Sequence, residues 1–290
     1  MKQSPAWDNE ALLQSPLLFP LHPLFSKFNL TNLPTLQDCN TLLQSMQPPI
    51  KVQSGALLRF VPHEDGKLPF ERQYEPRCYL DGEVPTRLNN LHDVLNALVW
   101  LTFPKSKAAI NARHYHALTK EGSACGIASS SERGATRDVN TLLDESGVIV
   151  VYGNTELADL LGDFQWKELF WQRRQQVRAG MDFYIFGHGL YEKALQPYIG
   201  MTGQGLLLPV GLEFFNWPLV ERIKHIDCLL ADYLAVPEHC RKTRDLSPVP
   251  LLGIPGWSIE NEHASYYDNT AYFRAGRHGK SSLIKSISEC

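Results

Sequence analysis

Histidines next to carboxylates occur in two segments that are far apart in the sequence, and these side chains are the best suited to proton transfer. His92-Asp93 stands at the start of a segment with helical periodicity. The run Gly187-His188-Gly189 follows an apolar stretch, and Glu192 comes one helical turn after the histidine. Imidazole exchanges protons near neutral pH, and a carboxylate can orient it or share its proton. The predicted catalytic residues are His188, Glu192, His92 and Asp93.

Each of these residues also has an ordinary structural explanation. Asn90 is a good N-cap, and Asp93 follows it at the spacing of a capping box, which would leave His92 on the surface of the first helical turn. His188, between two glycines, could be a core histidine that bonds to the main chain across a crowded turn. The local sequence leaves the functional and the structural interpretation open at both places.

Further polar residues could line a pocket with these histidines. Asn96 lies one turn beyond His92 on the same helix face. Lys107, Asn111 and His114 form a polar stripe on the next predicted helix, which could face either solvent or a pocket. Asp144-Glu145 lies where a hairpin is expected to turn, so turn formation is the favoured role for both residues. Alternatively, Asp138, Asn140 and Asp144, which would share one face of the expected strand, could bind a cation or orient a substrate.

The elements that position these residues follow from periodicity and from Gly, Pro and capping residues. Helices are expected over 91–103, 105–120, 166–179, 190–196 and 218–234, strands over 56–62, 73–80, 183–186 and 205–210, and a hairpin over 136–152. This order predicts an α+β fold with mixed α/β character. We expect one large domain over 1–275, with a small mixed sheet surrounded by helices, an N-terminal wrap over 1–60 and a long irregular C-terminal segment. A flexible tail is expected over 276–290.

Composition excludes several classes of protein. The 290 residues include 28 Lys+Arg and 31 Asp+Glu, so the formal charge of −3 does not favour nucleic-acid binding. The apolar runs are too short or too interrupted to span a membrane, and the first residues lack the apolar core of a signal peptide. The six cysteines are scattered without a Cys-x-x-Cys pair, which favours reduced thiols and a cytoplasmic location. The oligomeric state is not predicted.

Several motifs together resemble a bacterial family known as domain of unknown function 3025. They are Gly82–Arg87, Leu91-His92-Asp93, Asn96–Leu101, Phe103-Pro104 with Lys107, Arg137-Asp138, Phe186-Gly187-His188, Gly253-x-Pro255-Gly256-Trp257 and Phe273-Arg274. The resemblance extends from residue 70 to residue 275 and implies no particular reaction. It does imply that polar residues from several elements share one pocket. On this basis the predicted substrate-binding residues are Asn96, Lys107, Arg137, Asp138 and Arg274.

The function these residues suggest is that of an enzyme, a hydrolase or transferase acting on a small anionic molecule. His188 or His92 would be the general base, a carboxylate would orient it, and Arg137 or Lys107 would bind the anion. No cofactor is predicted and no metal ligand is assigned, although a metal-assisted version of the reaction would use His92, Asp93 and His188. The alternative is a non-catalytic ligand-binding or scaffold protein, in which the same residues form structural ion pairs.

Overall fold

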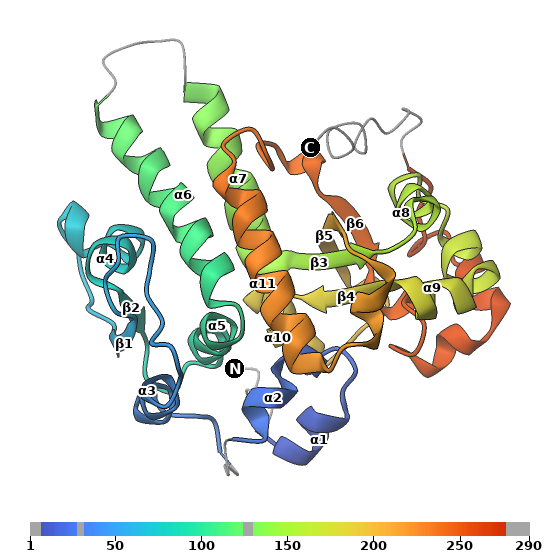
Figure 1. Ribbon diagram of the computed structural model, residues 1–290, viewed down its shortest axis with the longest axis horizontal. Coiled ribbons are helices and arrows are strands. Elements are labelled where there is room, and N and C mark those ends of the chain that lie inside the picture. Colours follow the sequence, from blue (N-terminus) through green and yellow to red (C-terminus); the bar gives the residue numbers. More distant parts are fainter. Residues whose placement is uncertain (1–6, 28–31, 124–129, 277–290) are drawn as a thin grey trace.

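A small mixed β-sheet lies at the centre of the molecule and is covered by helices. The computed structural model describes residues 7–27, 32–123 and 130–276. The strands of the central sheet are β3 (Gly147–Tyr152), β4 (Met181–Ile185), β5 (Thr202–Pro209) and β6 (Ser247–Pro250), in the order β4-β3-β5-β6. β3 pairs with β4 antiparallel and with β5 parallel, and β5 pairs with β6 antiparallel. The predicted α+β class is confirmed (Figure 1).

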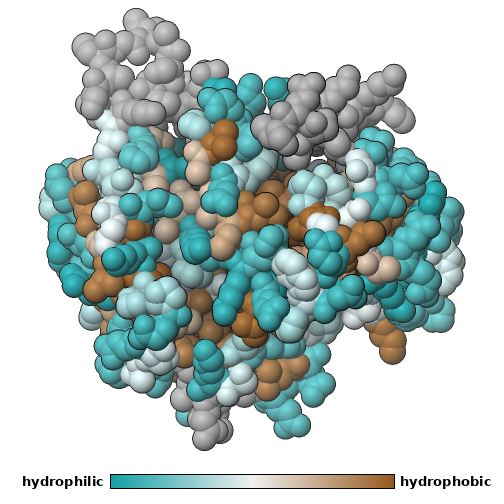
Figure 2. Space-filling view, viewed as in Figure 1, coloured by the Kyte–Doolittle hydropathy of each residue, from teal (hydrophilic) through white to brown (hydrophobic). Residues whose placement is uncertain are grey.

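The central strand β3 forms the middle of the core because every one of its residues is buried. A continuous apolar strand of this kind requires cover on both faces of the sheet. In Figure 1, α7 and α11 lie on one side of the strands, and α8 and α9 lie toward the opposite end. Figure 2 shows that the outer surface on this side is mixed, with hydrophilic residues around scattered apolar areas.

The helices that concern the candidate site pack against one another on one side of the sheet. They are α4 (Tyr74–Asp81), α5 (Leu91–Thr102), α6 (Pro104–Ser123), α7 (Ser130–Ser146), α10 (His188–Ala194) and α11 (Leu219–Ala235). Helix α6 contacts α4, α7 and α11, whereas α10 contacts α5 and α7. The ends of α5, α7 and α10 are therefore brought to one place.

The remaining elements frame this core. They are α1 (Asn9–Gln14), α2 (His22–Phe25), α3 (Leu36–Gln44), α8 (Thr155–Gly162), α9 (Arg174–Gly180), and the parallel pair β1 (Arg59–Pro62) and β2 (Glu83–Thr86). The chain after β6 continues as short 3-10 turns up to residue 268. Within the described parts of the chain, no helix has both the length and the apolar character needed to cross a membrane. The predicted tail lies outside the described residues except for Gly276.

The hairpin predicted over 136–152 is wrong, because its first half is the last part of helix α7. Val139 and Leu143 are both fully buried and lie one helical turn apart, so this segment has a helical apolar face. Glu145-Ser146-Gly147 is consequently a junction between α7 and β3 rather than a hairpin turn. This correction decides where the acidic residues at the end of the segment lie.

The strand predicted over 73–80 is also wrong, because these residues form helix α4. Pro76 lies in the first turn of that helix, where its missing N–H costs little. The helix ends at Gly82, whose φ of 69° is in the left-handed region that suits glycine. The predicted helix after Asn90 is confirmed, and the Asn90 side chain accepts a 3.0 Å hydrogen bond from the Asp93 main-chain N–H.

Candidate functional site

The two histidine segments meet at one end of the central sheet. His92 is the second residue of α5 and His188 is the first residue of α10. Their Nε2 atoms are 3.0 Å apart, and the two rings are arranged edge to face. The predicted catalytic histidines are thus in direct contact, although nearly a hundred residues separate them in the sequence.

Carboxylates from two helices complete this arrangement. Glu192 on α10 places Oε2 3.1 Å from Nδ1 of His92. Glu145, near the end of α7, places Oε1 3.4 Å from Nε2 of His188 and 3.8 Å from Nε2 of His92. We call His92, His188, Glu145 and Glu192 the histidine cluster. The glutamates are about half exposed and His92 is one-third exposed, whereas His188 is buried, so solvent reaches the cluster from one side.

The two glycines beside His188 are required by the end of α7, which lies directly against them. A Cβ atom on Gly187 would come within 2.4 to 2.5 Å of main-chain atoms of Glu145, Ser146 and Gly147. A Cβ atom on Gly189 would lie 2.7 Å from Oε2 of Glu145. The Gly-His-Gly sequence therefore lets α7 and α10 approach closely enough for Glu145 to reach both imidazoles.

Below the cluster is a network of buried polar side chains. Lys107 donates a 2.8 Å hydrogen bond to Oδ1 of Asn96 and forms an ion pair with Asp144. Asn96 in turn donates a 2.7 Å hydrogen bond to the hydroxyl of Tyr74. Asp144 links the network to the cluster, because its Oδ2 lies 3.6 Å from Nδ1 of His188.

The polar stripe on α6 faces the interior rather than solvent. Lys107, Asn111 and His114 are all buried. Asn111 donates a 2.6 Å hydrogen bond to Oε2 of Glu75. Burial raises the pKa of Glu75 to about 7 and lowers the pKa of His114 to about 4. The interpretation of this stripe as a solvated helix face is wrong.

The carboxylates nearest the histidines are held in their ionised form. Burial by itself would raise the pKa of Asp144, but the charges of Lys107 and His188 hold that pKa below its usual value. The contacts with His188 and His92 lower the pKa of Glu145 despite its partial burial. Asp144, Glu145 and Glu192 thus surround the imidazoles. Among the described residues, the one ammonium in contact with any of these carboxylates is that of Lys107, which pairs with Asp144.

The structure does not bring every predicted residue into the cluster. Asp93 accepts hydrogen bonds from the main chain and the guanidinium of Arg87, at 2.7 Å each, and so closes the loop before α5. Arg137 and Asp138 are exposed on α7, about two helical turns before Glu145. The main chain of Arg274 accepts a 2.8 Å hydrogen bond from Trp166, in the segment between α8 and α9.

Asp144 and Glu145 lie in the site, whereas turn formation was the role favoured for both residues from the sequence. They were interpreted as turn residues because a hairpin was expected. The signal that could have placed them was the helical spacing of Val139 and Leu143, which extends α7 as far as Ser146. Their position at the end of a helix is what directs both carboxylates toward α10.

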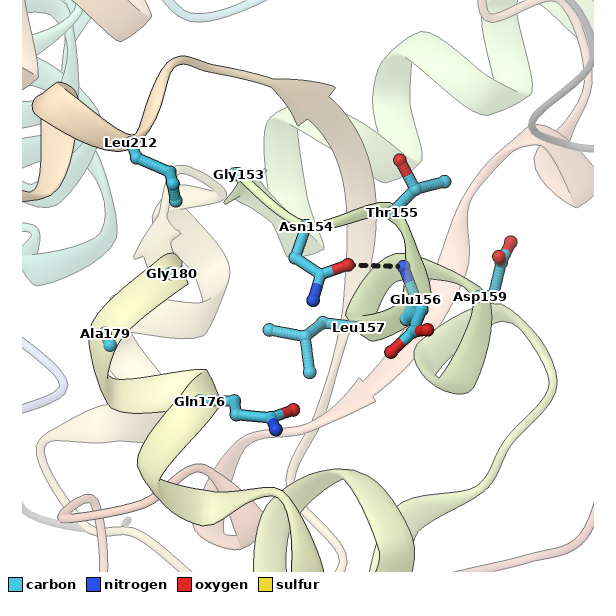
Figure 3. Close-up of a pocket in the computed structure, with 10 residues that line it drawn as sticks. All are labelled: Gly153, Asn154, Thr155, Glu156, Leu157, Asp159, Gln176, Ala179, Gly180 and Leu212. Carbon is cyan, nitrogen blue, oxygen red and sulfur yellow. Dashed lines mark hydrogen bonds between the residues drawn. The ribbon is translucent and has the colours of Figure 1, made fainter.

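A pocket of about 600 Å³ lies at the other end of β3 (Figure 3). It is formed where β3 leads into α8, beside the end of α9. Figure 3 shows Asn154 accepting a hydrogen bond from the Glu156 main chain, with Asp159 on the same helix. The residues that line this pocket include no histidine and no basic side chain. The site of interest is therefore the histidine cluster.

Comparison with known proteins places the chain in one family. A family model described as protein of unknown function (DUF3025) matches residues 58–277, which include all members of the histidine cluster. The chain therefore belongs to this family, as its motifs indicated. No curated protein and no solved structure matches the chain.

Proposed function

We propose that this DUF3025 protein is an enzyme, a hydrolase whose reaction centre is the histidine cluster. The observation that carries this proposal is the convergence of His92 Nε2, His188 Nε2 and Glu145 Oε1 at a place that solvent reaches. Ionisable side chains that only stabilise the fold are ordinarily paired with a hydrogen-bond partner or with a group of opposite charge. Here two imidazoles instead point the same ring nitrogen at a common position.

The flanking carboxylates support a role for the imidazoles in proton transfer. Glu192 lies beside Nδ1 of His92, and Asp144 lies beside Nδ1 of His188. A carboxylate in this position holds the proton on Nδ1 and leaves Nε2 as the basic atom. An imidazole Nε2 would take a proton from an attacking water molecule, whose oxygen bonds to the substrate as the leaving group departs. The imidazolium then returns the proton to the leaving group.

We propose further that the substrate is a small anionic molecule and that the protein is cytoplasmic. The exposed Arg137 is a candidate to attract the anion, since it stands on the same helix as Glu145. Lys107 is less suited to this role, because it is buried in its pair with Asp144. The cytoplasmic location is supported by Cys39, Cys78, Cys228 and Cys240, which are unpaired cysteines in the described structure.

The experiment that tests the hydrolase proposal is an activity assay on the purified full chain. The probes are p-nitrophenyl acetate, p-nitrophenyl phosphate and bis(p-nitrophenyl) phosphate. We expect hydrolysis of at least one probe, and a loss of roughly 10²-fold or more in kcat/KM for His188→Asn. His263→Asn, which changes an exposed histidine outside the cluster, should leave the rate unaltered.

The second candidate is a non-catalytic ligand-binding or scaffold protein. The observation that favours it is the buried network, in which Lys107, Asp144 and Asn96 satisfy one another without a substrate. In that case wild-type protein and His188→Asn would hydrolyse none of the probes at a measurable rate. That result would contradict the hydrolase proposal.

A further inference from the structure

The geometry points to a divalent metal site formed by His92, His188 and Glu145, with zinc as the expected ion. The inference rests on the proposed hydrolase function and changes its mechanism: with both Nε2 atoms bound to the ion, the ion rather than an imidazole would activate the water. The three ligand atoms lie within 4.8 Å of one another. Each comes from a different helix, so the site exists only in the folded chain.

The distances between the ligand atoms are close to those around a single ion. Zinc binds histidine nitrogen and carboxylate oxygen at about 2.0 to 2.2 Å in a tetrahedron, so two ligands of one ion lie about 3.3 to 3.6 Å apart, and the two imidazoles would move about 0.3 Å farther apart on binding. The separations are 3.0 Å between the two Nε2 atoms, 3.4 Å from His188 to Glu145 and 3.8 Å from His92 to Glu145. A small rotation of the half-exposed Glu145 side chain would bring the last value into range.

Each imidazole has a carboxylate beside its Nδ1 atom, within hydrogen-bond distance at His92 and slightly beyond it at His188. A histidine ligand ordinarily donates its other ring N–H to a carboxylate, which fixes the tautomer. Glu192 has this position for His92 at 3.1 Å, and Asp144 has it for His188 at 3.6 Å. Nδ1 of His188 is buried without a hydrogen-bond partner, so Asp144 is the acceptor toward which it would move.

This tautomer leaves two lone pairs facing each other. With the protons on Nδ1, both Nε2 atoms are acceptors only, and 3.0 Å is a repulsive separation for two acceptors. A cation between them removes the repulsion and converts it into attraction. The surrounding charge also calls for a cation, because among the described residues the one ammonium in contact with Asp144, Glu145 or Glu192 is that of Lys107, which pairs with Asp144. A divalent ion would balance the difference.

The ligand types select among ions. Two imidazole nitrogens and one carboxylate suit zinc and the other late first-row metals, whereas Mg²⁺ prefers oxygen ligands alone. Three protein ligands leave a coordination position for water, which is the pattern of catalytic rather than structural zinc sites. The partial exposure of His92 and Glu145 places that open position on the solvent side. A bound cation would also give an anionic substrate a positive group to bind.

The test is a zinc titration of full-length protein stripped with EDTA, followed by calorimetry. We expect one Zn²⁺ ion per chain and no measurable binding of Mg²⁺ at the same concentrations. His188→Asn and Glu145→Gln should each weaken zinc binding by at least 100-fold, and Glu192→Gln by about 10- to 100-fold, since it removes only an outer contact. His263→Asn is the matched control and should bind as wild type does.

Two further measurements keep the test decisive. If His188→Asn fails to fold by circular dichroism, the half-exposed Glu145→Gln variant carries the comparison. Co²⁺ should give visible absorption bands in wild type that Glu145→Gln lacks. Failure of wild-type protein to bind Zn²⁺, or equal binding by wild type and both ligand variants, would overturn the inference.

The outcomes for the metal site and for the proposed function are separable. Zinc binding that depends on His188 and Glu145, without hydrolysis of any probe, supports the metal site and contradicts the hydrolase. Hydrolysis that His188→Asn abolishes, by a wild-type protein that binds no Zn²⁺, supports the hydrolase and overturns the metal site.

Discussion

At the scale of single residues, similar side chains have two different surroundings in this protein. His92, Glu145 and Glu192 are partly exposed at the cluster, whereas Lys107, Asn96 and Asn111 are buried below it. Lys107, Asn96 and the Asn111 amide nitrogen donate hydrogen bonds to neighbouring side chains, which limits the loss of stability from burying them. The exposed groups are in contact with solvent.

Glu75 provides a prediction about pH at this scale. Its pKa is about 7 in the folded protein and 4.5 when unperturbed, so between these values the folded chain keeps a proton that the unfolded chain loses. Below pH 4.5 this carboxyl therefore does not reduce the free energy of unfolding. As the pH rises from 4.5 to 7 it lowers that free energy progressively, by about 3 kcal/mol at most. Glu75→Gln should remove that loss while still accepting the bond from Asn111.

Urea unfolding at pH 5 and pH 8 measures the effect. The variant should gain stability relative to wild type at pH 8 more than at pH 5. Glu71→Gln, which changes an exposed glutamate one position before Arg72 in the same stretch of chain, should show no such difference between the two pH values. A variant-to-wild-type difference that is constant with pH would show that Glu75 does not titrate in this range.

At the scale of elements, the site depends on how closely the end of α7 approaches the start of α10. The limiting contacts are those of Gly187 with the main chain of α7 and of Gly189 with the Glu145 carboxylate. Main-chain atoms cannot move aside without disturbing the helix, whereas the end of a glutamate side chain can. The two glycines should therefore respond differently to the same substitution.

We expect Gly187→Ala to destabilise the protein by several kcal/mol, on the order of 3, because the new methyl group overlaps main-chain atoms. Gly189→Ala should cost less stability but displace Glu145 and weaken zinc binding by 10-fold or more. Urea unfolding and zinc calorimetry measure the two effects. Gly134→Ala, which has open space around it in α7, is the control. Equal losses of stability in both glycine variants would refute this distinction.

At the scale of the whole molecule, the segment after β6 is tied to the core by a buried asparagine. Asn261 is fully buried and donates hydrogen bonds of 2.9 and 2.7 Å to the carbonyls of Leu252 and Ile254. Arg174 of α9 donates bonds of 3.1 and 3.0 Å to its main-chain oxygen and to Oδ1. One side chain thus joins the irregular C-terminal segment to a helix beside the sheet.

Asn261→Ala should lower the free energy of unfolding by about 3 kcal/mol, since it removes the buried side-chain hydrogen bonds to Arg174, Leu252 and Ile254, each worth about 1 kcal/mol. Urea unfolding measures this change. Asn216→Ala, on an exposed asparagine, should be close to neutral. Zinc binding by the folded Asn261→Ala protein should match wild type, because none of the contacts of Asn261 involves the cluster. A loss below 1 kcal/mol would mean that the segment is held elsewhere.

Local sequence determined the elements whose signals are local. Asn90 caps α5 by accepting a hydrogen bond from the Asp93 main chain, and the apolar run before Gly187 is strand β4. The two histidine segments contain the residues that meet. The predicted α+β class followed from the same signals. They succeed because capping and strand formation depend on neighbours within a few residues.

Only the tertiary structure decided which polar residues share a site. Asp93 is bound to Arg87, and the main chain of Arg274 is bound to Trp166. Neither Asp93 nor Arg274 lies in the cluster, although both belong to the same set of motifs as His188. Glu145 entered the cluster because α7 continues to Ser146 and then stops against Gly187, a contact between segments that no local spacing encodes. The physical reason is that proton transfer and metal binding depend on distances of a few ångströms between atoms on separate helices, and packing of α5, α7 and α10 sets those distances.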